Sequence, residues 1–139
     1  MSLLDQAQRF FAALNAQDLD QVVSMISPVC DIRTPQGTFT GGEAYRDWIS
    51  GLFRALPDFT HELRGIAVES GPTIAFELHA AGTFTGPLAM PGGDVAPNGR
   101  FIDVPGADLW RFEDGKIVEY HLYFDQMEFL TQLGIAPGR

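Results

Sequence analysis

The apolar and polar positions in the first part of the chain follow the pattern of amphipathic helices. Apolar residues recur at intervals of three and four, which places them on one face of a helix. Ser2 and Asp18 are suited to cap the first two helices, and Pro28 and Pro57 are expected to end the second and third. The apolar positions are Leu4, Ala7, Phe10, Phe11 and Leu14, then Leu19, Val22, Val23 and Ile26, then Tyr45, Trp48, Ile49, Leu52 and Phe53.

Extended segments dominate the rest of the chain. Asp114-Gly115 is typical of a two-residue hairpin turn, and a final helix is expected to close at Gly134. Helices followed by a long antiparallel meander predict an α+β fold, formed as one domain over residues 1–139. Long strands curl, so we expect a cone-shaped antiparallel sheet wrapped around three N-terminal helices, with a pocket left inside. The predicted strands are 29–33, 59–68, 73–85, 100–112 and 116–125.

The predicted hairpin places several polar side chains on one wall. If Glu113 faces Lys116, counting outward sets Asp108 opposite His121, and cross-strand partners point to the same side. Alternation along the last strand adds Tyr123 and Asp125 to that side, and Trp110 lies nearer the turn. His121 and Asp108 form either part of a reactive site or a structural hydrogen bond.

Two further segments carry open alternatives. Residues 86–99 are the longest irregular stretch, and they form either a lid over the pocket or an exposed connection. Pro105-Gly106 interrupts a predicted strand, so a bulge or bend is expected there. His61, near the start of a strand, is expected to be exposed.

Composition narrows the range of partners. The net charge of −9 and a pI near 4.5 disfavour nucleic acid and anionic membranes. A soluble protein of the cytoplasm is expected, because the start of the chain lacks the features of a signal peptide and no apolar stretch is long enough to span a bilayer. The single cysteine, Cys30, excludes an intrachain disulfide and is interpreted as a buried structural thiol.

The sequence gives no signal for a bound metal or cofactor. Its three histidines lie in separate predicted strands without a short-spaced ligand pair. Gly92-Gly93 lies in a proline-rich connection rather than before a helix, so it is not a phosphate-binding loop. Chemistry without a metal or cofactor is therefore expected, and the acidic charge is compatible with a neutral or weakly charged small molecule as the partner.

Four short segments occur in this order along the chain: Phe-Arg-Ala-Leu-Pro-Asp (53–58), Gly-Thr-Phe-Thr-Gly-Pro (82–87), Trp-Arg-Phe-Glu-Asp-Gly-Lys-Ile-Val-Glu (110–119), and Tyr-Phe-Asp (123–125) with Gln-Leu-Gly (132–134). Together they resemble the SnoaL-like polyketide cyclases of the nuclear transport factor 2-like superfamily. This resemblance implies three helices and a curved sheet around an apolar pocket, in a homodimer. It also implies that an aspartate at the end of the last long strand, here Asp125, acts as acid/base in an intramolecular aldol ring closure. A histidine of that family is not matched within residues 107–110.

The Tyr-Phe-Asp sequence at 123–125 also resembles limonene-epoxide hydrolases of the same superfamily. Their Arg-x-Asp pair is expected near residues 77–81, where this chain reads Glu-Leu-His-Ala-Ala. The charged pair that opens an epoxide is therefore missing, which makes this a third and weaker hypothesis.

The leading hypothesis is a cofactor-independent cyclase or isomerase that acts on a hydrophobic, polyketide-like substrate, as the resemblance implies. A carboxylate in an apolar pocket has a raised pKa and accepts a proton from carbon. Asp125 would be that acceptor, assisted by His121, Tyr123 and Asp108. Residues expected to contact substrate are Trp48, Tyr45, Phe11, His79 and Trp110.

Two alternatives use the same residues without catalysis. Asp125 is also placed to cap the helix that begins at Gln126. Separately, the alternative hypothesis is that the protein is a non-catalytic binding module whose pocket holds an apolar ligand or a partner.

Overall fold

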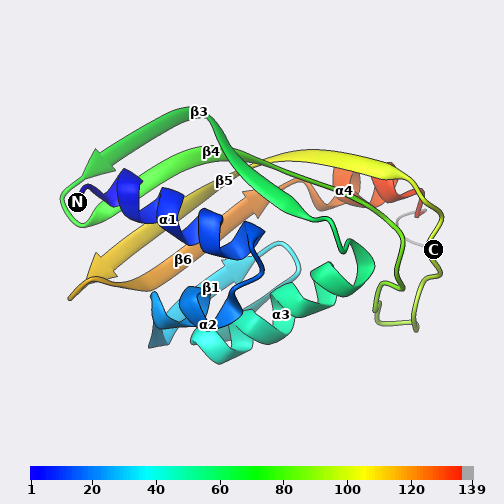
Figure 1. The fold of residues 1–139 in the computed structure, drawn as a ribbon, viewed down its shortest axis with the longest axis horizontal. Coiled ribbons are helices and arrows are strands. Elements are labelled where there is room, and N and C mark those ends of the chain that lie inside the picture. Colours follow the sequence, from blue (N-terminus) through cyan, green and yellow to red (C-terminus); the bar gives the residue numbers. More distant parts are fainter. Residues whose placement is uncertain (136–139) are drawn as a thin grey trace.

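The computed structural model describes residues 1–135. A curved six-stranded sheet carries three helices on one face, here called the inner face, and a fourth helix lies near the end of the sheet (Figure 1). No helix among these residues is long and apolar enough to cross a membrane. The elements are α1 (Leu3–Asn15), α2 (Leu19–Ser24), β1 (Ile26–Thr34), β2 (Gly37–Thr40), α3 (Gly42–Ala55), β3 (Thr60–Ser70), β4 (Thr73–Thr83), β5 (Phe101–Glu113), β6 (Lys116–Phe124) and α4 (Gln126–Leu133).

The strands follow the order β2-β1-β6-β5-β4-β3. All neighbouring pairs are antiparallel except β1 and β6, which run parallel. The α3 helix connects β2 at one edge to β3 at the other, so the inner face is crossed by helix rather than by loop. The predicted α+β class, with a curved sheet around N-terminal helices, is confirmed.

The helix ends are determined by local capping. Ser2 and Asp5 form a reciprocal capping box at α1, and Asp18 accepts a hydrogen bond from the backbone N–H of Gln21 at α2. The prediction that Pro28 ends α2 is wrong, because α2 already ends at Ser24 and Pro28 lies inside β1. The pairing of β1 with β6 shifts register there, and such an irregularity is where a strand tolerates proline.

The hairpin between β5 and β6 has the predicted turn but not the predicted register. Asp114 and Gly115 both have positive φ, and Glu113 pairs with Lys116. A bulge follows: Phe112 pairs with Ile117 and Arg111 with Glu119, which leaves Val118 without a partner across the hairpin. An added residue moves every later side chain to the opposite face of the sheet relative to a regular count.

Trp110 therefore lies opposite Tyr120, and Asp108 lies opposite Leu122. The predicted pairs, Asp108 with His121 and Trp110 with Glu119, are wrong. Asp108, Trp110, Tyr120 and Leu122 alternate onto the inner face, whereas His121 and Glu119 alternate onto the outer face.

An aromatic cluster joins α1 and α3 to the inner face. Phe10 of α1 contacts Trp110 edge-to-face, with ring centroids 4.8 Å apart. Tyr45 of α3 and Tyr120 of β6 lie 5.1 Å apart by the same measure. Trp110 and Phe10 are fully buried, so these contacts form the centre of the core.

The predicted burial of Cys30 is confirmed. Burial, with Asp31 and Glu119 nearby, raises the pKa of the thiol to about 12. A thiol in that environment stays protonated and unreactive at neutral pH.

The N-terminal end of the irregular segment 86–99 is hydrogen-bonded to the end of α3. Thr85 and Gly86 donate backbone hydrogen bonds to the Ala55 carbonyl at the end of α3. Leu88 is buried and forms an antiparallel bridge with Val95. The segment is thus neither wholly exposed nor detached from the helix layer.

Candidate functional site

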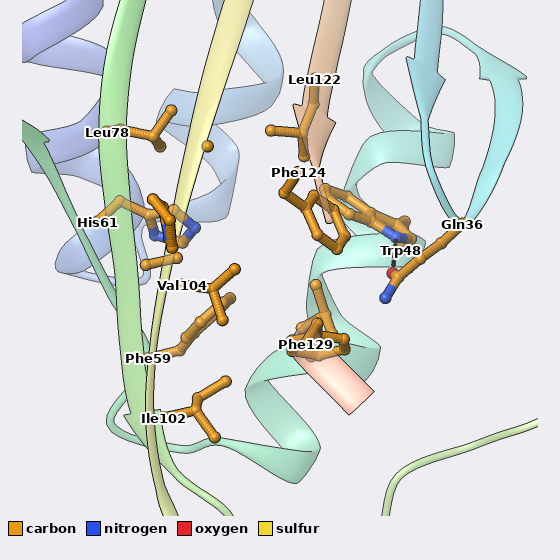
Figure 2. Close-up of a pocket in the computed structure, with 14 residues that line it drawn as sticks. Gln36, Trp48, Phe59, His61, Leu78, Ile102, Val104, Leu122, Phe124 and Phe129 are labelled. Carbon is orange, nitrogen blue, oxygen red and sulfur yellow. Dashed lines mark hydrogen bonds between the residues drawn. The ribbon is translucent and has the colours of Figure 1, made fainter. Parts of the chain in front are cut away.

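A cavity opens between the inner face of the sheet, α3 and α4 (Figure 2). Most of its wall is aliphatic or aromatic, and its volume of about 50 Å³ accommodates a few water molecules or a small apolar group. We call this space the inner cavity. Three side chains with polar atoms also line it: Gln36, Trp48 and His61. Its apolar wall includes Leu52, Leu78, Val104, Leu122, Phe124 and Phe129.

A second space, the outer cavity, shares part of this wall. It has a volume of about 490 Å³ and is also lined by residues 88–91 of the irregular segment. Gln36, Trp48, Leu52 and Phe129 line both spaces, so a ligand in the outer cavity can extend an apolar group toward the inner one. The combined space is within the range of small-molecule sites.

Hydrogen bonds join the elements at the shared wall. Trp48 Nε1 donates to Gln36 Oε1 at 3.0 Å, and Gln36 Nε2 donates to Gln126 Oε1 at 3.2 Å. These bonds connect α3, the turn between β1 and β2, and the first turn of α4. The predicted substrate contact Trp48 therefore does lie at the cavity, between its two parts.

His61 is a half-buried residue on the inner-cavity wall, and the expectation that it is exposed is wrong. Its Nδ1 is buried and has no hydrogen-bond partner among residues 1–135. Desolvation lowers the pKa of the imidazole to about 4, so the ring is neutral at pH 7. The spacing of Phe59, His61 and Leu63, which alternates apolar and amphipathic residues, is the sequence signal that could have placed it inside.

Asp108 is the buried carboxyl group of the site, with 1% of its surface exposed. Its Oδ2 accepts a hydrogen bond from Trp110 Nε1 at 3.1 Å, while Oδ1 has no partner within the described residues. Burial raises the pKa of Asp108 to about 8, and Trp110 and Tyr120 offset part of this rise. At pH 7 the carboxyl group is therefore mostly protonated.

Two tyrosines extend this buried polar cluster. The hydroxyl groups of Tyr45 and Tyr120 are 3.2 Å apart, and burial raises the pKa of both phenols. Asp108 lies two residues along β5 from Gly106, which lines the inner cavity, and opposite Leu122, which also lines it. The cluster is thus directly behind one end of the cavity wall.

The predicted wall of four polar residues does not form. His121 lies on the outer face, with Nε2 3.5 Å from Asp31 Oδ2, and Tyr123 is 57% exposed. The predicted grouping of Asp108 with His121 and Tyr123 is wrong, because the bulge at Val118 separates them onto opposite faces. His79 lies within hydrogen-bond distance of Asp103, with 2.8 Å between Nδ1 and Oδ1.

Asp125 lies outside both cavities. Its side chain is exposed, and Oδ1 accepts a hydrogen bond from the backbone N–H of Glu128 at 3.1 Å, so the predicted capping of α4 is confirmed. The prediction that this carboxylate is held in a dry pocket is wrong. The reason is local: α4 begins directly after β6, so the residue between them is used as the N-cap.

The remaining predicted substrate contacts belong to the core behind the cavity. Tyr45, Phe11 and Trp110 are all buried and do not line either space. Phe11 stacks on both His61 and Trp110, with ring centroids 5.6 Å apart in each pair. Within residues 1–135, no three His, Cys, Asp or Glu side chains gather to hold a metal ion.

Comparisons with known proteins agree with this architecture. Residues 7–120 match the SnoaL-like domain. IdmH from Streptomyces antibioticus, provisionally described as a polyketide cyclase, has a TM-score of 0.81 at 26% identity, over 97% of this chain and 100% of that one. A provisional SnoaL-like polyketide cyclase from Jannaschia sp. CCS1 has a TM-score of 0.81 at 22% identity, over 96% and 92%.

AclR from Streptomyces galilaeus, provisionally described as a hydroxylase, has a TM-score of 0.78 at 22% identity, over 96% of this chain and 81% of that one. No curated protein matches the sequence significantly. The described activities differ although the fold is shared, as is usual for widely used folds. Since the matched domain spans most of the sequence, the chain belongs to the SnoaL-like family.

Proposed function

We propose that the protein is a cofactor-independent cyclase or isomerase that acts on a hydrophobic, polyketide-like molecule. The support is threefold: membership of the SnoaL-like family, a similar fold in IdmH, and an apolar cavity with few polar groups. A molecule of this kind would occupy the outer cavity and place one ring or chain in the inner cavity.

The position of Asp108 carries the proposal. A carboxylate accepts a proton from carbon more readily when burial raises its pKa, and Asp108 meets that condition behind the cavity wall at Gly106 and Leu122. The sequence predicted a raised carboxyl pKa at Asp125. The burial of Asp108 instead supports Asp108 as the carboxyl group with the raised pKa.

In the proposed reaction, ionised Asp108 takes a proton from the carbon next to a ligand carbonyl. The C–H bond breaks, an O–H bond forms on Asp108, and the electron pair becomes an enolate. The enolate then either attacks a second carbonyl of the same molecule and closes a ring, or regains the proton at another position. Neutral His61 is suited to donate a hydrogen bond to the enolate oxygen.

Hydrogen–deuterium exchange tests this proposal. The probe is 2-tetralone, an aromatic ketone with exchangeable protons, followed by NMR in D2O. We expect the wild type to accelerate exchange, Asp108→Asn to lose about a hundredfold of the acceleration, and Asp125→Ser to retain it. Equal acceleration by Asp108→Asn would remove Asp108 from the reaction.

A second candidate function is a non-catalytic binding module. It is favoured by the fact that Asp108 lies behind the cavity wall rather than on it. This alternative predicts that 2-tetralone binds, with chemical-shift changes in cavity residues, but that its exchange rate stays at the uncatalysed value.

We also propose that the protein forms the homodimer implied by its family. The outer face of the sheet presents Leu109 and Tyr123 to solvent, and burial of these side chains against a second copy would favour association. Sedimentation velocity of the wild type and of Tyr123→Asp tests this, with dissociation expected for the variant. A wild type that sediments as a monomer would refute it.

A further inference from the structure

We propose that His61 recognises a hydroxyl group on an aromatic or enolic part of the ligand. This inference rests on the proposed function only in taking the inner cavity as the ligand site; it does not require catalysis. Among the residues of 1–135 that line the inner cavity, only His61 has a titratable side chain. Figure 2 shows the imidazole pointing into the cavity between Phe59 and Leu78.

The fold holds this ring in place from three directions. Asn15 brackets the backbone of His61, since its Nδ2 donates to the His61 carbonyl at 2.9 Å and its Oδ1 accepts from the His61 N–H at 2.8 Å. Phe11 stacks on one face of the imidazole. Phe59 contacts it edge-on, with centroids 4.7 Å apart. A ring positioned so firmly is preorganised for a ligand.

Residues 1–135 leave Nδ1 of this ring without a hydrogen-bond partner, although most buried side-chain polar atoms have one. All the contacts that hold the ring are aromatic or go through the backbone, so a phenylalanine would satisfy them equally well. An imidazole at this position therefore points to a polar partner that enters with the ligand.

The chemistry of the ring limits what that partner is. A neutral imidazole has one donor and one acceptor nitrogen, and the apolar wall disfavours a charged ligand group. A hydroxyl group both donates and accepts, so it satisfies either nitrogen. The inner cavity is small, which favours a single hydroxylated ring or enol there, with the remainder of the molecule in the outer cavity.

Three matched probes test the inference: phenol has a hydroxyl, anisole an ether oxygen that only accepts, and toluene neither. Affinities for the wild type and for His61→Phe are measured by NMR titration. We expect the ratio of the toluene Kd to the phenol Kd to fall about tenfold in His61→Phe, as the loss of one hydrogen bond implies. Phenol should also move the ¹⁵N signals of the His61 ring, and toluene should move them little.

Two controls separate a recognition role from a structural one. His61→Gln keeps a donor and an acceptor, so it should restore part of the preference for phenol, and toluene should bind His61→Phe as well as it binds the wild type. An unchanged ratio in His61→Phe, or no binding of any probe to the wild type, would overturn the inference. Unchanged exchange in Asp108→Asn, with the wild-type preference for phenol intact, would refute the proposed reaction but not the recognition role of His61, so the two proposals can fail independently.

Discussion

The ring of His61 stacks on the ring of Phe11, with 5.6 Å between their centroids and 27° between their planes. Phe11 lies on α1 and His61 on β3, so the packing of the first helix on the sheet fixes the orientation of a cavity side chain. Asn15, one helical turn after Phe11, fixes the backbone of the same residue. A change in the docking of α1 is therefore expected to reach the cavity directly.

The lowered pKa of His61 predicts an acid-dependent loss of stability. Between pH 6.5 and about 4 the unfolded chain binds a proton that the folded chain does not, so the free energy of unfolding falls as the pH falls through that window. Relative to His61→Phe, the wild type should lose about 2–3 kcal/mol over it. Urea unfolding of both proteins at several pH values measures this. A difference that does not change with pH would contradict the lowered pKa.

The main elements of the fold could be predicted because each has a local cause. Capping side chains begin α1, α2 and α4, alternation identifies β4 to β6, and Asp114-Gly115 gives the turn. The register could not be predicted beyond that turn. The bulge at Val118 depends on how β6 pairs with both β5 and β1, and pairing with a distant strand leaves no local pattern.

The candidate site was only partly predictable for the same reason. Asp108 was predicted as a member of the polar wall, but its partner across the hairpin was assigned by counting through the bulge, and Asp108 lies opposite Leu122 instead of the predicted histidine. Trp48 and Tyr45 were predicted from the same helical stripe, yet only Trp48 lines the cavity, whereas Tyr45 is buried in the core behind it. His61 was missed because the burial of a strand's first residues depends on α1, which lies far away in the sequence.

The raised pKa of Asp108 predicts the opposite pH dependence from that of His61. The folded chain keeps a proton on this carboxyl up to about pH 8, whereas an ordinary aspartic acid in the unfolded chain loses it near pH 4. Stability should therefore fall as pH rises between these values and level off above. Asp108→Asn keeps an acceptor for Trp110 and does not ionise.

The free energy of unfolding of Asp108→Asn should consequently rise relative to that of the wild type, by an amount on the order of 2–4 kcal/mol between pH 4 and pH 8. Chemical unfolding across this range gives the difference directly. A constant difference would mean that Asp108 is ionised in the folded protein at neutral pH.

The N-cap role of Asp125 predicts a loss of stability without a loss of chemistry. Asp125→Ala removes the acceptor for the Glu128 N–H and should cost about 1 kcal/mol, whereas Asp125→Ser keeps a capping oxygen and should cost much less. Both variants should exchange 2-tetralone protons at the wild-type rate. Loss of exchange in both, with the fold intact, would return Asp125 to the reaction.

The close packing of Gly86 against the end of α3 predicts that stability depends on this contact. A Cβ at this position would lie 1.9 Å from the Arg54 carbonyl oxygen, so Gly86→Ala must displace backbone, whereas a Cβ at Gly92 meets nothing within 4 Å. We expect Gly86→Ala to cost about 3 kcal/mol and Gly92→Ala less than about 0.5 kcal/mol. Because residues 88–91 line the outer cavity, Gly86→Ala should also weaken 2-tetralone binding. Thermal unfolding and NMR titration of the two variants test both effects, and equal behaviour would show that the contact with α3 is not needed.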